Sequence, residues 1–91
     1  MREDEKKFFL LCLKYGRKSY GNYSDEYYTD VRDIIGILSD LDIMHHKRCW
    51  YLLEKWCRMG FYDYGVTLDL GWFYPTELPA QYRTLLEGGK V

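Results

Sequence analysis

The residues best suited to chemistry lie near the middle of the chain, where His45, His46 and Cys49 combine imidazole and thiol groups. On a helix, positions i, i+3 and i+4 share one face, so Cys49 would lie beside both histidines. A structural zinc site needs four such ligands, and Cys57 would lie about 12 Å further along the helix, too far to bind the same ion. The pattern therefore favours a helix start and a core cysteine over a metal site, and we expect no cofactor.

Covalent catalysis is the other chemistry to consider, and it needs a nucleophile beside a base and an orienting acid. The cysteines fall at apolar helical positions, and the sequence has no glycine-rich nucleophile turn and no phosphate-binding glycine pattern. The carboxylates cluster at expected helix starts and turns, where capping and solvation account for them. We therefore expect that the protein is not an enzyme.

The segment from Met44 to Gly60 must position these residues, and it has the pattern of a basic amphipathic helix. Its apolar residues recur at helical spacing. They are Cys49, Leu52, Leu53, Trp56 and Met59. Gly60 then supplies the left-handed C-terminal position that glycine adopts without strain. We predict that the helix ends at Gly60 and that Trp56 is buried in the core.

The next segment, residues 61–74, predicts a β-hairpin, because it is dense in the aromatic and β-branched residues that favour strands. The turn can lie near Gly65 or near Gly71, and we favour the second position. That choice gives a half-buried strand whose apolar residues alternate with polar ones. The alternating apolar residues are Val66, Leu68 and Leu70.

Two helices are expected before this pair of elements. The first begins with the acidic residues 3–5 and ends at Gly16, with an apolar face between Phe8 and Tyr15. The second is capped by Ser24, with an acidic first turn and an apolar face between residues 28 and 38.

A tight turn at residues 39–44 suits a helix-turn-helix, and a last helix is expected after Thr76. The shared apolar face of that last helix contains Leu78, Tyr82, Leu85 and Leu86. The predicted order is helix, helix, helix, β-hairpin, helix. This is a mainly α structure with a β-hairpin, in the α+β class, and residues 1–91 make one domain.

Composition limits where such a domain can work. The 91 residues are 47% hydrophobic, which suits an ordered globular core. The longest apolar run, Phe8–Leu13, is far shorter than the ~20 residues that cross a bilayer, so we expect no membrane association. Three cysteines are an odd number without a paired framework, which favours a reducing compartment. We therefore expect a cytoplasmic protein.

Charge is segregated along the chain although the net charge is only −1. Residues 1–21 carry a net charge of +3, residues 22–43 carry −5 and residues 44–60 carry +3. One basic block therefore falls on the helix that ends at Gly60, which is a pattern found in proteins that bind nucleic acids.

Residues 25–74 resemble the winged helix-turn-helix superfamily. The residues that carry the resemblance are the turn Ser39–Asp42, the helix core Leu52, Leu53 and Trp56, the pair Met59 and Gly60, and the aromatic hairpin that follows. The aromatic-rich character is also similar to that of small phage and prophage proteins of Gram-positive bacteria. The resemblance implies a winged-helix-like fold and a DNA-binding accessory or transcriptional regulator of phage or mobile-element origin.

In such folds the exposed face of the third helix meets the major groove of double-stranded DNA. Carried over by position, the basic residues that would grip phosphates are Lys47, Arg48, Lys55 and Arg58. The residues that would supply shape or base contacts are His46, Trp50 and Tyr51.

The alternative is a non-enzymatic protein-interaction module, such as a phage-encoded inhibitor of a host or defence protein. Residues 62–74 contain Asp63 and Asp69 but no Lys or Arg, whereas a wing near phosphates is normally positive. The hairpin is also aromatic on both alternating faces, and its own core can cover only one of them. We therefore predict that an interface, either a homodimer contact or a partner site, contains Tyr62, Tyr64 or Trp72.

Overall fold

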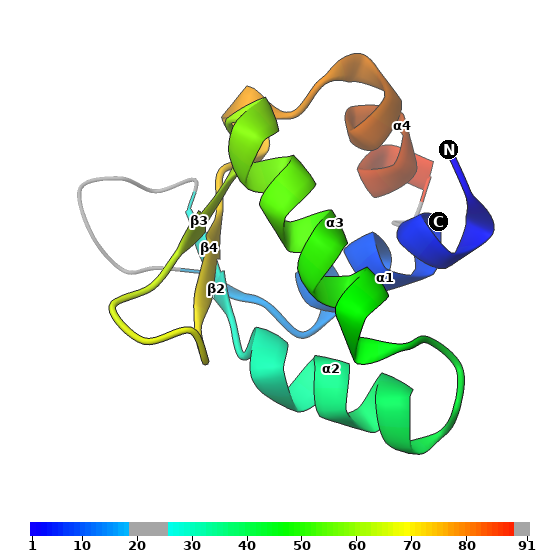
Figure 1. The fold of residues 1–91 in the computed structure, drawn as a ribbon. Helices are drawn as coiled ribbons and strands as arrows, with labels where there is room; N and C mark the ends of the chain where they lie inside the picture. The colour runs from blue at the N-terminus through cyan, green and yellow to red at the C-terminus, as the bar shows by residue number, and fades with distance from the viewer. Residues whose placement is uncertain (19–25, 89–91) are drawn as a thin grey trace.

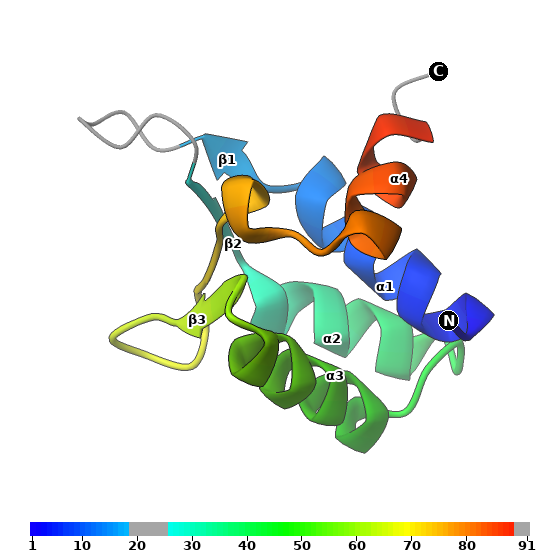
Figure 2. The same cartoon turned by 90° about the horizontal axis from the view of Figure 1, so that it is seen from above.

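The computed structural model of the chain describes residues 1–18 and 26–88, which form a mainly α, winged-helix-like α+β structure (Figure 1). The helices are α1 (Glu3–Lys14), α2 (Val31–Asp40), α3 (His46–Met59), the short 3₁₀ helix η1 (Pro75–Glu77) and α4 (Ala80–Gly88). The strands are β1 (Arg17–Lys18), β2 (Tyr27–Thr29), β3 (Tyr62–Tyr64) and β4 (Gly71–Phe73). The strands lie at one end of the molecule and the helices at the other (Figures 1 and 2).

The sheet holds two strands that the sequence pattern did not predict. Within the described residues its order is β1-β2-β4-β3, and all neighbours are antiparallel. Strand β2 pairs with β4, where Tyr28 lies opposite Trp72. The Thr29 hydroxyl donates a hydrogen bond of 2.8 Å to the carbonyl oxygen of Cys12, which ties this strand to α1. The strand before α2 joins the hairpin strands, as in a winged helix.

The predicted start of the second helix is wrong. Helix α2 begins at Val31, with Asp30 at its N-cap position, and Glu26 lies before strand β2 rather than in a helical turn. The proposed cap, Ser24, lies outside the described residues. Pairing with β4 explains the change, because the aromatic and β-branched residues 27–29 gain ladder hydrogen bonds there. An acidic first turn was thus a weaker signal than strand pairing.

The hairpin connection is a loop that begins at Gly65 and ends just before Gly71, so it spans both predicted turn positions instead of forming a tight turn at one of them. Strands β3 and β4 are short, and residues 65–70, which we call the wing loop, connect them. The wing loop is closed where the Gly65 amide donates to the Leu70 carbonyl oxygen at 2.8 Å. The favoured strand pattern is therefore wrong, since Val66 and Leu68 are exposed instead of half-buried. In both views this loop, coloured yellow, extends away from the helices (Figures 1 and 2).

The core is centred on Trp56, and its predicted burial is confirmed. The Trp56 ring stacks on Phe8 with 5.3 Å between centroids, and meets Phe9 edge-on at 5.7 Å. Helix α3 ends as predicted, because Gly60 adopts φ +93° and its amide donates to the carbonyl oxygens of Trp56 and Cys57. These contacts fix the direction in which the chain leaves α3 and enters β3.

The last helix starts later than expected. Residues 75–77 form η1, and α4 begins at Ala80. Pro79 explains the interruption, because the residue before a proline is driven into extended conformation, and Leu78 indeed has φ −67° and ψ 129°. Tyr82 is buried as predicted, whereas Tyr15, expected on the apolar face of the first helix, lies beyond α1 and is exposed.

Candidate interaction surface

Helix α3 presents one buried and one exposed side. His45 caps its N-terminus, where the imidazole Nδ1 accepts a hydrogen bond of 3.1 Å from the Lys47 amide. The buried residues are Cys49, Leu52, Leu53 and Trp56. The opposite side, which we call the outer face of α3, is exposed or half-buried and contains His46, Lys47, Trp50, Tyr51, Glu54 and Arg58. This face contains five of the seven residues predicted to bind DNA or a partner.

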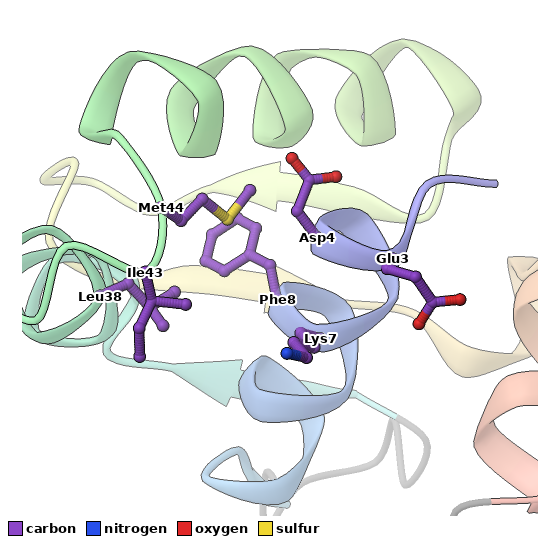
Figure 3. Close-up of a pocket in the computed structure, with 7 residues that line it drawn as sticks. All are labelled: Glu3, Asp4, Lys7, Phe8, Leu38, Ile43 and Met44. Carbon is purple, nitrogen blue, oxygen red and sulfur yellow. The ribbon is translucent and has the colours of Figure 1, made fainter.

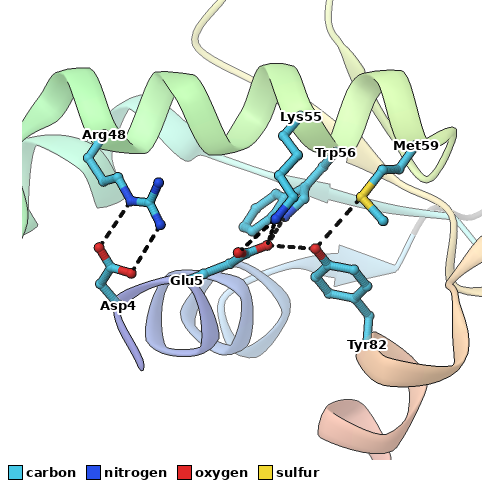
Figure 4. Close-up of polar contacts among 7 residues, drawn as sticks. All are labelled: Asp4, Glu5, Arg48, Lys55, Trp56, Met59 and Tyr82. Carbon is cyan, nitrogen blue, oxygen red and sulfur yellow. Dashed lines mark hydrogen bonds and ion pairs between the residues drawn. The ribbon is translucent and has the colours of Figure 1, made fainter. Parts of the chain in front are cut away.

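The other two predicted binding residues, Arg48 and Lys55, point toward α1 instead (Figure 4). Arg48 makes a two-bond contact with Asp4, with Nε–Oδ2 and Nη2–Oδ1 distances of 3.1 and 3.3 Å. The hydrogen bond from Arg48 is the largest influence on the Asp4 carboxyl, and it holds the pKa of Asp4 below its ordinary value. The same contact raises the pKa of Arg48.

Lys55 contacts Glu5, a buried carboxylate that links three helices. Lys55 Nζ lies 3.0 and 3.2 Å from its two oxygens, Trp56 Nε1 donates at 3.0 Å, and the Tyr82 hydroxyl donates at 2.6 Å (Figure 4). Burial raises the pKa of Glu5, but these hydrogen bonds together outweigh it, so that the pKa lies below its ordinary value. The carboxylate is therefore charged and fully engaged. We call these contacts the polar seam: Asp4, Glu5, Arg48, Lys55, Trp56 and Tyr82.

Among the described residues, only two of the four basic residues predicted to contact phosphates are therefore unpaired on the outer face of α3. Arg48 and Lys55 are paired within the domain, so the expectation that they project toward a ligand is wrong. Lys47 and Arg58 are exposed and make no ion pair within residues 1–18 and 26–88. Glu54, on the same face, accepts a hydrogen bond from the Tyr64 hydroxyl. The outer face of α3 therefore carries charges of both signs.

The wing loop is apolar, and it is held in place at the start of α2. The Arg32 guanidinium lies 2.7 Å from Asp69 Oδ1, and the Arg32 amide also donates to the Asp69 carbonyl oxygen. Between the two closing contacts, Val66 is fully exposed and Leu68 is 60% exposed. The loop thus offers aliphatic side chains to the solvent from a braced backbone.

The three predicted interface residues on the hairpin differ in exposure. Tyr62 is 1% exposed, so the prediction that it contacts a partner is wrong. Register is the reason: Tyr62 lies opposite Phe73 on the covered side of the sheet, and α3 packs on β3. Trp72 lies on the other side, half-buried against Tyr28 with 5.6 Å between ring centroids. Tyr64 is half-buried and bonded to Glu54, and burial together with that bond raises its pKa to about 12.

The cysteines are poorly suited to nucleophilic chemistry. Cys12 and Cys49 are fully buried, and burial raises the pKa of both thiols, that of Cys49 to about 11. Burial also raises the pKa of Cys57. The thiols are therefore protonated near neutral pH. In the part of the chain that the structure describes, no group of three or more His, Cys, Asp or Glu side chains is arranged to hold a metal ion.

No protein-family model, curated protein or solved structure matches this chain. Across residues 1–18 and 26–88, none of the helices combines the length and the apolar character that a membrane crossing needs.

Sequence reasoning missed the role of Glu5, although a signal was present. Glu5 was grouped with the acidic residues that open the first helix, yet it shares the helical face of Phe8, Phe9 and Cys12. A carboxylate on an apolar stripe is buried only when donors from neighbouring elements satisfy it. That pattern could have predicted a basic partner on another helix, and hence the loss of one cation from the outer face of α3.

Proposed function

We propose that this protein is a non-enzymatic protein-interaction module that binds its partner through the outer face of α3 and the wing loop. The wing loop carries the proposal, because it exposes Val66 and Leu68 and contains Asp69 but no Lys or Arg. A wing that approaches DNA needs positive charge, since phosphate contacts dominate that affinity. Neighbouring exposed aliphatic residues on a braced loop are instead a common feature of protein-binding sites.

The outer face of α3 supports the same proposal. Tyr51 is half exposed, and the Arg48 guanidinium lies 5.4 Å from the centre of its ring, which is a cation–π contact. Trp50, the preceding residue, is half-buried. Glu54 is exposed and adds a negative charge to the same face. Tyrosine, tryptophan and arginine are the residues that most often dominate the energy of protein interfaces. A face of this composition suits a protein better than a phosphate backbone.

The partner class follows from the sequence resemblance. The aromatic-rich sequence resembles small phage and prophage proteins, and an inhibitor of a host or defence protein is the form that we propose. Three free cysteines in the described residues support a reducing, cytoplasmic location.

DNA binding is the second candidate function, and one observation favours it. Lys47 and Arg58 are exposed on the outer face of α3, and α2, its following turn and α3 have the order of a helix-turn-helix. Two cations can contribute a few phosphate contacts, and the affinity would then be weak and strongly dependent on salt. In this reading the protein is an accessory factor or transcriptional regulator.

Affinity capture with matched variants tests the proposed function. The immobilised protein, a Tyr51→Ala, Val66→Ser, Leu68→Ser variant and a Gln81→Ala control are exposed to lysate of a Gram-positive bacterium, and captured proteins are quantified by mass spectrometry. Gln81 is exposed on α4, away from the proposed surface. We expect one captured protein that the control retains and the triple variant loses. Equal capture by all three proteins would overturn the proposal.

A further inference from the structure

A second apolar surface lies at the corner where α2 turns into α3. Three large aliphatic side chains are exposed there: Ile37 by 58%, Leu41 by 64% and Ile43 by 54%. Single exposed aliphatic residues are ordinary, but three within seven positions of one corner are not scattered. We call them the corner residues.

The corner has a fixed backbone. Ile37 lies in the last turn of α2 and Leu41 is the residue that follows its end, four positions further on, so the two side chains are neighbours. The amides of Ile43 and Met44 both donate to the Leu38 carbonyl oxygen, at 2.9 and 3.3 Å. Asp42 adopts φ +59°, a left-handed conformation that Asp and Asn tolerate better than most residues. The turn therefore presents Ile43 in a defined position next to the helix.

A hollow opens beside Ile43, between the corner and the first turns of α1 (Figure 3). Its volume is about 110 Å³, and its lining combines buried Phe8, Leu38 and Met44 with the charged residues Glu3, Asp4 and Lys7 of α1. Binding sites for small molecules usually need about 300–1,000 Å³. The hollow is therefore too small for such a ligand, but its size suits a single aliphatic side chain.

Negative charge surrounds this apolar surface. Asp33 lies one turn before Ile37, and Asp40 and Asp42 flank Leu41. All three carboxylates are exposed or at the helix end, and none forms an ion pair within the described part of the chain. Arg32, the basic residue of α2, forms its ion pair with Asp69 of the wing loop and not with these carboxylates. On the α1 side the exposed cation Lys7 also lines the hollow, together with Glu3 and Asp4, so the charge around the corner is predominantly negative but includes one cation.

We propose that the α2–α3 corner is a docking surface for a basic amphipathic helix of a protein partner. A helical side chain ridge with i, i+4 spacing packs well against the groove of another helix. One apolar side chain of that helix would enter the hollow, and its Lys or Arg residues would face Asp33, Asp40 and Asp42. This surface is separate in residues from the outer face of α3 and the wing loop, and it holds whether that face binds protein or DNA.

A synthetic peptide of about 14 residues, or four helical turns, tests the proposal. It carries leucines at i, i+3, i+4 and i+7 and lysines elsewhere, and a matched peptide has glutamates in place of the lysines. Binding to the full chain is measured by fluorescence anisotropy. We expect the lysine peptide to bind and the glutamate peptide not to bind. Added salt should weaken the complex because exposed charges are screened.

Two double variants of the protein locate the site. Ile37→Ser with Leu41→Ser removes the apolar contact, and Asp33→Asn with Asp40→Asn removes charge at constant size. Each should raise the Kd of the lysine peptide about tenfold or more. Gln81→Ala, a substitution of an exposed residue on α4 outside both proposed surfaces, is the control and should leave the Kd unchanged.

Three outcomes would overturn the proposal. They are equal binding of the lysine peptide to all variants, equal binding of both peptides, and the absence of binding by either peptide. Light scattering adds a separate check: a dimer that the Ile37→Ser, Leu41→Ser variant converts to a monomer would make a second copy of the chain the occupant. Circular dichroism and thermal melting confirm that each variant is folded, as expected for substitutions of exposed residues.

Discussion

The polar seam and the wing loop differ in how they use their side chains. In the seam, Glu5 is buried and accepts hydrogen bonds from three other residues, on α3 and α4. In the wing loop, Val66 and Leu68 face solvent, and Arg32 contacts the loop only at Asp69. The seam satisfies its polar groups within the domain, whereas the loop leaves apolar groups without a partner among the described residues.

The difference shows which parts of α3 are available for binding. A basic residue that is already paired within the domain must give up that pair before its charge can contact a ligand. Arg48 and Lys55 are paired with α1 and hold the fold together, while Lys47, on the same helix, faces solvent. Counting cations along α3 therefore overestimates its affinity for phosphates.

The largest expected effect is on the core beside the seam. Trp56→Ala should lower the free energy of unfolding by about 3–5 kcal/mol, because it removes a fully buried aromatic ring. Trp50→Ala is the matched control, and since Trp50 is only half-buried its loss should be clearly smaller. Urea denaturation followed by circular dichroism measures both. A larger loss for Trp50→Ala would mean that α3 faces the other way.

The seam should depend on the charge of Glu5. Glu5→Gln keeps the size of the side chain but weakens the hydrogen bonds from Lys55, Trp56 and Tyr82, at a cost of about 2–3 kcal/mol at pH 7. The pKa of Glu5 is lower in the folded state, so the unfolded chain binds more protons in acid and stability rises with pH.

The pH dependence gives a separate readout of the same group. The advantage of wild type over Glu5→Gln is complete above the ordinary pKa of about 4.5 and shrinks as pH falls through the lower folded value. Urea denaturation at a series of pH values between 7 and about 3 measures the difference in free energy of unfolding between the two proteins. A difference that stays constant in acid would show that Glu5 is not held as a carboxylate.

The smallest expected changes in stability come from removing single hydroxyl groups from two buried tyrosines. The Tyr82 hydroxyl donates to Glu5, whereas the Tyr62 hydroxyl has no hydrogen-bond partner within the described residues. Tyr82→Phe should therefore cost about 1.5 kcal/mol, and Tyr62→Phe should be neutral or stabilise by up to about 1 kcal/mol. Thermal melting of the two variants decides the point. Equal losses would mean that Tyr62 has a polar partner after all.

Much of the fold was predictable because local signals agreed with tertiary packing. The apolar stripe around Trp56 and the glycine at the end of α3 identified both the buried side and the end of that helix. Strand β2 was not predicted, because residues 27–29 also fit the start of a helix and only pairing with β4 decides between the two. Non-local pairing of this kind leaves little trace in a short sequence window.

The candidate surface was predictable only in part. Helical spacing correctly placed Lys47, Tyr51 and Arg58 on the exposed side of α3. Spacing cannot show that Arg48 meets Asp4, since the two residues lie 44 positions apart. The exposure of Val66 was likewise hidden, because its alternating pattern suggested a strand and the backbone instead forms the wing loop.

Titration with duplex DNA tests the central claim, that the outer face of α3 and the wing loop bind protein rather than phosphate. Fluorescence anisotropy is measured with a labelled mixed-sequence duplex at about 20 mM salt, where electrostatic affinity is strongest. The protein and a Lys47→Glu, Arg58→Glu variant are compared. We predict no saturable binding by either protein. Binding by the wild type that falls steeply with added salt and is lost in the variant would contradict the claim and establish DNA as the ligand.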